Sequence, residues 1–350
     1  MADLRIGVFG AGAIGGYVGT RLAAAGFPVV LVGRGDLAST GGALTAIDLE
    51  GQEHRAQVAV TTDPAALAAT DVCLVTVKSG DSPAAGRLLA EHLPPATVVV
   101  SLQNGIRNTN ALGGLLQRSV VPGMVTYNVR RESPARFRKA TSGPIMTGRG
   151  EGPQAAIMLR LAEAFARAGE PIELRADMDA VQLTKLLLNL NNGLCALTGL
   201  SLATSLRSRS IRRAFSACLA EGVRVARANG LALTRIGPLA PSLVARLLDV
   251  PDFLFFRLAS SMMAIDPAAR SSTLQDIDRG KLTEIDFLSG EIVGLARRAG
   301  LDAPANHFVT EQVHRLERAG RPPPFLSAED LWAGIQRALG ASTAAARATV

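Results

Sequence analysis

Three polar side chains interrupt a stretch that is otherwise mostly leucine: Lys185, Asn189 and Asn192. Offsets of four and seven residues place all three within about 60° on one face of a helix with 3.6 residues per turn. Burying a lysine or an amide costs free energy unless the group is hydrogen-bonded. The pattern therefore predicts the lining of a polar pocket. A lysine that extends to solvent, beside asparagines at a helix end broken by Gly193, is the alternative.

A second polar group lies between Arg270 and Asp286. We expect a long helix to begin near Thr283 and to run to Arg298. The hydroxyl and carboxylate groups either line a site or cap helices, because carboxylates in a first turn are favoured by the helix dipole in any case. The side chains concerned are Ser271, Ser272, Thr273, Asp276, Thr283, Glu284 and Asp286.

A glycine-rich turn follows the apolar run Leu4 to Phe9 and precedes a helical pattern that extends to Ala25. Gly10 permits a tight turn, Gly12 lets backbone approach a phosphate, and Gly15 lets the helix approach the strand. A helix N-terminus after such a turn aims unpaired N–H groups at one point, which suits a pyrophosphate. The turn predicts dinucleotide binding, unless it has lost its ligand. The residues expected to contact the dinucleotide are Gly10, Ala11, Gly12, Ala13, Ile14 and Gly15.

Arg34 lies about twenty residues beyond this loop, at the end of a second predicted strand, Pro28 to Val32. An acidic residue at this position hydrogen-bonds the ribose of NAD, whereas a basic residue pairs with the 2′-phosphate of NADP. Arg34 therefore favours NADP. Alternatively, Arg34 is an ordinary surface arginine, and the nearby acidic residue Asp36 leaves NAD as a possible cofactor.

Two further strand ends carry polar residues. Lys78 follows the apolar run Asp71 to Val77, and Asn104 follows the strand predicted for Thr97 to Leu102. In open α/β sheets this edge faces the ligand, so Lys78 and Asn104 are candidates for cofactor or substrate contacts. The alternatives are a solvated loop lysine and an ordinary Asn-Gly turn.

The length of 350 residues exceeds what one hydrophobic core usually supports. Alternating strands and helices predict an α/β Rossmann domain over residues 1–175. From Asp177 onward, apolar residues recur at three- and four-residue spacing, which predicts an all-helical domain over 176–340. Residues 341–350 are rich in Ala, Ser and Thr and lack large apolar side chains, so we expect a disordered tail.

The composition, 48% hydrophobic and 19% charged, is that of a folded globular protein. Three dispersed cysteines, Cys73, Cys195 and Cys218, indicate a reducing compartment. With no leader pattern and no bilayer-length apolar run, we expect a cytoplasmic protein, and we expect no bound metal. The net charge of +7 raises nucleic acid as a partner. Because the arginines are scattered and aromatics are few, a field that attracts anionic substrate and cofactor is favoured, and neither nucleic acid nor a membrane is expected.

Taken in order and spacing, these motifs resemble those of the ketopantoate reductase (2-dehydropantoate 2-reductase) family, from the glycine loop to about residue 318. The resemblance implies that NADPH reduces the 2-keto group of ketopantoate to give pantoate, a step of pantothenate biosynthesis. Lys185 would hydrogen-bond the keto oxygen and supply its proton. The other implied roles are ketone or nicotinamide positioning by Asn104 and Asn189, carboxylate binding by Ser272, hydroxyl binding or orientation of Lys185 by Glu284, and cofactor contacts by Arg34 and Lys78.

Two positions depart from the family pattern. The family commonly has asparagine where this chain has Gly193 and Ala269, and Asn192 is the expected substitute for the first. Both changes affect substrate recognition rather than hydride transfer. Another branched 2-keto acid or an opine-type substrate therefore stays open, as does a non-enzymatic NADP-binding sensor. A homodimer through the helical domain is also open.

Overall fold

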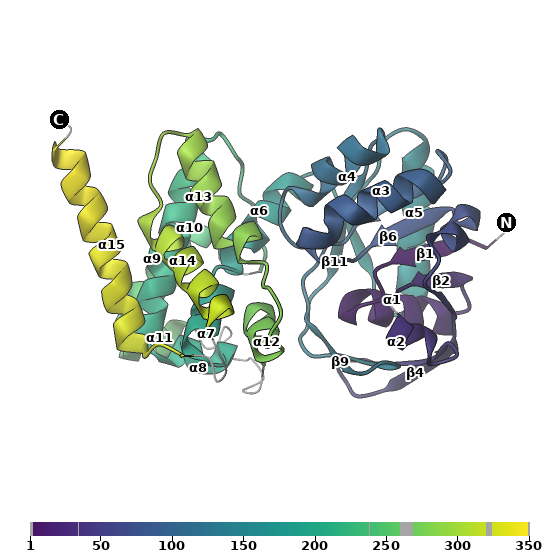
Figure 1. Cartoon of the computed structure of the whole chain (residues 1–350), viewed down its shortest axis with the longest axis horizontal. Coiled ribbons are helices and arrows are strands. Elements are labelled where there is room, and N and C mark those ends of the chain that lie inside the picture. Colours follow the sequence, from purple (N-terminus) through teal and green to yellow (C-terminus); the bar gives the residue numbers. More distant parts are fainter. Residues whose placement is uncertain (1–2, 34, 238, 260–268, 320–323, 349–350) are drawn as a thin grey trace. The chain divides into compact units, whose positions relative to one another are not determined.

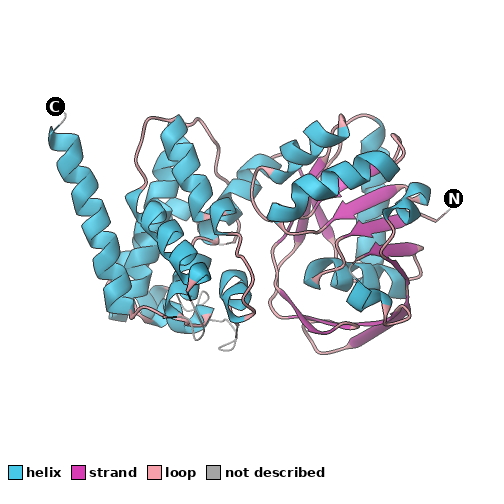
Figure 2. Cartoon of the chain, in the orientation of Figure 1, coloured by secondary structure: helices cyan, strands magenta, loops and turns pink. Residues whose placement is uncertain are grey.

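The computed structural model describes residues 3–33, 35–237, 239–259, 269–319 and 324–348. The chain divides into two compact units, Met1–Gln182 and Leu183–Val350. Every strand in the described ranges lies in the first unit, and the regular elements of the second are helices (Figure 2). This confirms the predicted fold class, an α/β domain followed by a helical one. The boundary between the units falls within helix α6 (Met178–Leu188). Gln182, the last residue of the first unit, donates from its side chain to the Gly123 carbonyl of the same unit at 3.1 Å.

The first unit contains two sheets and the helices that cover them (Figure 1). Its strands are β1 (Ile6–Phe9), β2 (Val29–Val32), β3 (Ala43–Ile47), β4 (Glu53–Gln57), β5 (Ala59–Thr61), β6 (Val72–Val75), β7 (Val98–Ser101), β8 (Val121–Val125), β9 (Val129–Ser133), β10 (Arg136–Lys139), β11 (Ile145–Gly148) and β12 (Ile172–Arg175). Its helices are α1 (Ala13–Ala24), α2 (Gly35–Ala38), α3 (Ser82–His92), α4 (Asn108–Leu116) and α5 (Pro153–Arg167), with 3₁₀ turns η1 (Pro64–Ala69) and η2 (Ser79–Asp81).

The main sheet has the strand order β12-β11-β8-β7-β6-β1-β2-β5. Strands β5, β2, β1, β6, β7 and β8 are parallel, and β11 joins β8 antiparallel. Strands β1, β6 and β7 are buried throughout, which explains their uninterrupted apolar sequences. The chain order reverses between β1 and β6. In open parallel sheets, ligands bind outside the carboxyl ends of the strands at such a reversal.

The two faces of the main sheet are covered by different helices. Side chains of α1 and α5 pack with Ile6, Val8 and Leu74, whereas side chains of α3 and α4 pack with Phe9 and Val75. Because successive strand residues point to opposite faces, Val8 and Phe9 belong to different cores. The glycine loop that joins β1 to α1 is thus held from both sides of the sheet.

A second sheet, of order β4-β3-β10-β9, lies beyond α1 (Figure 1). Strand β3 pairs antiparallel with β4, and β9 pairs antiparallel with β10. Phe137 of β10 packs against Gly16 of α1, where any added β-carbon would collide with the ring. This sheet therefore grips the helix that begins at the glycine loop.

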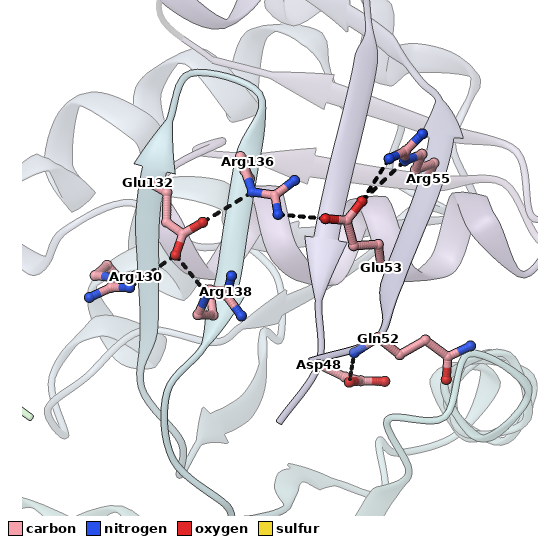
Figure 3. Close-up of polar contacts among 8 residues, drawn as sticks. All are labelled: Asp48, Gln52, Glu53, Arg55, Arg130, Glu132, Arg136 and Arg138. Carbon is pink, nitrogen blue, oxygen red and sulfur yellow. Dashed lines mark hydrogen bonds and ion pairs between the residues drawn. The ribbon is translucent and has the colours of Figure 1, made fainter. Parts of the chain in front are cut away.

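Ion pairs occupy the face of this sheet that points away from α1 (Figure 3). Arg130, Arg136 and Arg138 all donate to Glu132, and Arg136 also reaches Glu53 at 2.5 Å. The hydrogen bond from Arg138, with its neighbours, lowers the pKa of Glu132 to about 2. Arg130, Arg136 and Arg138 are thus paired with carboxylates of the same sheet.

The second unit is built on α9, a long helix with a buried apolar face. Glu221 on α9 accepts hydrogen bonds from the N–H groups of Ala305 and Asn306, at 2.8 and 3.0 Å, and thereby caps α14. The elements of this unit are α7 (Asn191–Thr198), α8 (Leu202–Arg207), α9 (Arg209–Ala228), α10 (Pro241–Asp249), α11 (Asp252–Leu258), α12 (Ser272–Asp278), η4 (Ile285–Phe287), α13 (Ser289–Arg298), α14 (Pro304–Arg318) and α15 (Ala328–Ala348).

Two predictions for the second unit are wrong. The helix expected from Thr283 to Arg298 is a 3₁₀ turn, η4, followed by a separate helix, α13. The tail expected to be disordered from residue 341 belongs to α15, which continues to Ala348. Alanine has the highest helix propensity, so a segment without large apolar side chains still extends an existing helix.

The three cysteines are free thiols, and all are buried. Burial raises the pKa of Cys73 to about 12 and that of Cys195 to about 11. None of the helices in the described ranges is both long and apolar enough to cross a membrane.

Candidate active site

The glycine loop is shaped by close approaches that only glycine allows. Gly10 has φ +105°, and an added β-carbon would lie 2.7 Å from the backbone nitrogen of Val77. A β-carbon at Gly15 would collide with the Gly10 carbonyl and the Thr76 hydroxyl. Gly10 and Gly15 therefore let the loop, the helix and the end of β6 meet, which are the roles predicted for them.

Gly12 differs from these two glycines because, among the residues that the structure describes, none comes within 4 Å of where its β-carbon would be. It is the exposed N-cap of α1, and no side chain caps the helix there. The first N–H groups of a helix have no intrahelical partner, so Ala13, Ile14 and Gly15 offer donors at this end. An open, uncapped helix N-terminus at the reversal of the sheet fits the pyrophosphate of a dinucleotide.

The end of β2 lies beside the glycine loop. A β-carbon at Gly33 would be 2.8 Å from the β-carbon of Ala11. Arg34, the predicted partner of the 2′-phosphate, lies outside the described residues. Asp36 opens α2, and its carboxylate pairs with Arg131 at 2.9 Å. The Asp36 carboxylate at the end of β2 thus has a basic partner in the second sheet.

Lys78 and Asn104 lie where the sequence predicted, at the carboxyl ends of β6 and β7, which are neighbours in the sheet. Lys78 is exposed and half-buried Asn104 follows β7. The Asn104 carbonyl accepts hydrogen bonds from Ser79 Oγ at 3.1 Å and from Asn108 Nδ2 at 2.6 Å. These contacts fix the turn that presents the Asn104 side chain.

A buried polar network beneath these residues was not predicted. The Gln103 amide donates to the Val77 carbonyl at 3.0 Å and to Ser82 Oγ at 2.7 Å. Ser82 in turn donates to the Asn108 side chain at 2.8 Å. Buried polar groups need such partners, so the network ties the ends of β6 and β7 to the starts of α3 and α4. The available signal was Gln103, a polar residue two positions after the buried strand β7.

In the second unit, Lys185 lies near the end of α6, and the predicted continuous helix is wrong. Helix α6 ends at Leu188 and α7 begins at Asn191. Between them the chain tightens into turns, in which the Asn189 N–H reaches the Leu186 carbonyl at 3.1 Å and the Asn192 N–H reaches the Asn189 carbonyl at 2.9 Å. Asparagine is a weak helix former, which suits it to this break. The three polar residues therefore lie on two successive helices and the turn between them, rather than on one face of a single helix.

Lys185 and Glu284 interact electrostatically, although they are 99 residues apart. Burial lowers the pKa of Lys185 to about 8, and the negative charge of Glu284 opposes that shift. A lysine in this range gives up a proton far more readily than a solvated one. The structure thus brings together the two residues that were assigned catalytic roles.

Asn192 and Ser272 also meet. The Asn192 amide lies 3.5 Å from Ser272 Oγ, at the long limit of a hydrogen bond. Next to it, Ser271 Oγ donates to the Asn192 carbonyl at 3.2 Å and accepts from the Leu274 N–H at 3.2 Å, as the N-cap of α12. Ser271 is therefore the capping residue of the pair, and Ser272 is the one that faces an amide side chain.

The segment that carries Glu284 is clamped by α14. Glu317 accepts from the Thr283 N–H at 2.8 Å. His314 joins Glu317 at 3.0 Å and Asp286 at 2.9 Å through its two ring nitrogens. His314 and Glu317 had no role in the sequence interpretation, since only tertiary contact reveals that they hold the residues on both sides of Glu284.

Both units of the chain match models of one protein family. The family model for ketopantoate reductase PanE/ApbA matches residues 6–152, and the model for its C-terminal part matches residues 177–317. The chain belongs to the ketopantoate reductase PanE/ApbA family. A 2-dehydropantoate 2-reductase of Halobacterium salinarum is 28% identical over 322 residues, which cover 91% of this chain and 100% of that protein.

Solved structures agree with this assignment. A PanE/ApbA family ketopantoate reductase from Ralstonia eutropha has a TM-score of 0.77 and 30% identity, with 90% of this chain and 99% of that chain covered. D-mandelate dehydrogenase, solved with NADH and anilino(oxo)acetate, shares the fold at a TM-score of 0.76 and 21% identity, with 90% and 99% covered. As a ketopantoate reductase family member, the protein is an oxidoreductase that acts on a keto group with a nicotinamide dinucleotide.

The two departures from the family pattern have different surroundings. At Gly193 an added β-carbon would lie 2.7 Å from Val309 and 3.1 Å from Ile285, because α7 packs closely against its neighbours. A larger side chain there requires repacking. Ala269 is half-buried, and its carbonyl accepts from the Leu202 N–H at 2.9 Å. In this ketopantoate reductase family member, Asn192, the residue before Gly193, directs its amide to Ser272.

Proposed function

We propose that this protein reduces ketopantoate to pantoate with NADPH and that Lys185 donates the proton. The observation that carries the proposal is a half-buried lysine that interacts with Glu284 and whose pKa is lowered by burial to about 8. A lysine in this state remains largely protonated near neutral pH, yet it transfers a proton readily. The names of the curated relatives support the choice of ketopantoate.

Lys185 would act on the ketone oxygen. A nicotinamide bound on the glycine loop would supply the hydride for the carbonyl carbon, and the oxygen would then carry negative charge. An ammonium group placed at the oxygen stabilises the charge and passes its proton to it. Glu284 keeps Lys185 more protonated than burial alone would allow. We assign Lys185 as the acid and Glu284 as the group that sets its charge and meets the substrate hydroxyl.

Substrate binding would use the amide and hydroxyl side chains near Lys185. Ser272, at the start of α12 and beside Asn192, is suited to a carboxylate because hydroxyl and amide groups donate to anions. Asn189, in the turn after α6, and Asn104, after β7, are assigned to the ketone or the nicotinamide.

The cofactor would lie on the glycine loop, with its pyrophosphate at the N-terminus of α1. Lys78 and Asn104 would contact its nicotinamide half, at the carboxyl ends of β6 and β7. The type of residue at Arg34 supports NADP over NAD, since a guanidinium pairs with a phosphate in a bidentate manner.

A turnover assay tests this function. NADPH and NADH are each supplied with ketopantoate and with a panel of straight-chain, branched and aromatic 2-keto acids. We expect the highest kcat/KM for NADPH with ketopantoate. A higher kcat/KM for another acid would make that acid the substrate. Such an acid is the second candidate because Gly193 and Ala269 depart from the family pattern. Tight NADPH binding with no oxidation by any keto acid would instead indicate a dinucleotide sensor.

We further propose a homodimer formed through the second unit. Helix α11 exposes Phe253 by 78% and Leu258 by 56%, and exposed apolar side chains of this kind mark association surfaces. Light scattering should give twice the chain mass of 36.4 kDa. A Phe253→Asp variant should give the mass of one chain, and a wild-type monomer at micromolar concentration would refute the dimer.

A further inference from the structure

Asp36 lies in the segment after β2 and is the only acidic residue among its described positions, 33 and 35–38. It stands about twenty residues beyond the glycine loop, where an acidic residue reads the ribose hydroxyl of NAD. Gly33 packs on Ala11, so this loop does adjoin the glycine loop. A free carboxylate here would favour NAD and repel the 2′-phosphate of NADP.

Arg131 of the second sheet engages that carboxylate. Its Nη1 lies 2.9 Å from Asp36 Oδ2, and its Nη2 donates to the Pro134 carbonyl at 3.2 Å. Its guanidinium also lies over the ring of Phe137, 5.8 Å from the centroid, and Phe137 packs on Gly16 of α1. Only a quarter of the Arg131 side chain is exposed. The arginine is thus anchored to the helix that begins at the cofactor loop.

The neighbouring arginine serves as an internal contrast. Strand residues alternate between faces, so Arg131 and Phe137 point toward α1 whereas Arg130 points away. Arg130 pairs with Glu132 at 2.9 Å, on the outer face of the sheet (Figure 3). One strand therefore provides one arginine directed at the dinucleotide loop and one that is not.

We propose that Arg131 is a specificity-determining residue that selects NADPH by neutralising Asp36. The inference rests on the proposed NADP dependence and deepens it. With Arg131 present, the carboxylate has a fixed partner and its charge is compensated, which lowers its repulsion of a 2′-phosphate and occupies an acceptor that a ribose hydroxyl would use. Without Arg131, the same carboxylate is an NAD-type determinant.

Equilibrium binding of NADPH and NADH to the full-length protein tests the proposal without turnover. Nicotinamide fluorescence or calorimetry gives Kd for wild type, Arg131→Ala, Asp36→Asn and the double variant, with Arg130→Ala as the matched control. Arg131→Ala should weaken NADPH about tenfold, the scale of one unit charge near a protein surface, and should leave NADH unchanged or tighter. Arg130→Ala should leave both Kd values within about twofold, as expected for an exposed ion pair.

The double variant decides whether Arg131 acts through Asp36. If it does, Arg131→Ala has little effect on NADPH once Asp36 is asparagine, and Asp36→Asn alone does not weaken NADPH. An unchanged ratio of the two Kd values in Arg131→Ala, or equal loss for both dinucleotides, overturns the inference. These outcomes differ from failure of the proposed function, in which wild type binds NADPH no better than NADH.

Discussion

The glycine loop and the polar residues around Lys185 both place polar groups beside apolar elements, yet the two regions are assembled in different ways. At the loop, consecutive backbone groups and three glycines within six residues make the surface. In the second unit, Lys185 of α6 interacts with Glu284, and Asn192 of α7 meets Ser272 of α12, so the partners come from segments 80 to 99 residues apart. The first site is local, and the second exists only through packing.

Removing the Lys185 side chain should give the largest effect. We expect Lys185→Ala to lower kcat by about 10² to 10⁴-fold, the usual contribution of a positioned acid, with NADPH binding retained. Steady-state turnover and NADPH titration measure the two quantities. Lys281→Ala, which removes an exposed lysine of the same unit, is the control and should turn over normally. Equal turnover of both variants would remove Lys185 from the chemistry.

Two glycine variants separate folding from ligand approach at the loop. Gly10→Ala forces φ +105° on a residue with a β-carbon and should lower the free energy of unfolding by about 1–3 kcal/mol. Gly12→Ala has room for its methyl group and should unfold like wild type. It should nevertheless weaken the binding of NADPH about 10- to 100-fold. The added methyl group would keep the pyrophosphate away from the backbone N–H groups, so hydrogen bonds to this charged group would be lost.

Thermal unfolding without ligand and NADPH titration distinguish the two variants. If Gly12→Ala bound NADPH as tightly as wild type, the pyrophosphate would not lie against this turn, and the glycine loop would not be the dinucleotide site.

The charge of Glu284 should tune the pH dependence of the reaction. Reduction requires the ammonium form of Lys185, so kcat/KM should fall as pH rises through about 8. Glu284 raises the pKa of Lys185, and Glu284→Gln should therefore move that fall to lower pH. Asp278→Asn, at an exposed ion pair of α12, should leave the profile in place. An unchanged profile in Glu284→Gln would mean that the carboxylate only binds substrate.

The His314 clamp should give the smallest effect, on stability rather than turnover. Burial lowers the pKa of His314, but hydrogen bonds to Glu317 and Asp286 outweigh burial and raise it above the ordinary value. Its stabilisation is therefore complete below the unfolded pKa of about 6.5 and is lost as pH rises through the folded pKa. Urea unfolding across this range should show a decline that His314→Gln lacks. A parallel decline in both proteins would place its cause elsewhere.

Prediction from sequence succeeded where one segment contains its own physical reason. Gly10 and Gly15 occupy the tight turn and the helix–strand contact expected of them, and Lys78 and Asn104 follow neighbouring parallel strands. It failed where propensities compete. The spacing of Lys185, Asn189 and Asn192 fits one helix, but the chain turns at Asn189 because a weak helix former offers little resistance.

The sequence by itself determined the strand–glycine–helix unit, the order of α/β and helical units, and the residue types available for proton transfer, because each follows from short-range sterics and apolar periodicity. Only the tertiary structure decided which partners these residues meet. It set Glu284 to act on Lys185, Ser272 beside Asn192, Glu317 and His314 around Glu284, and Arg131 on Asp36. The residues of these pairs are 28 to 99 positions apart in the chain, and their distances depend on how whole elements pack.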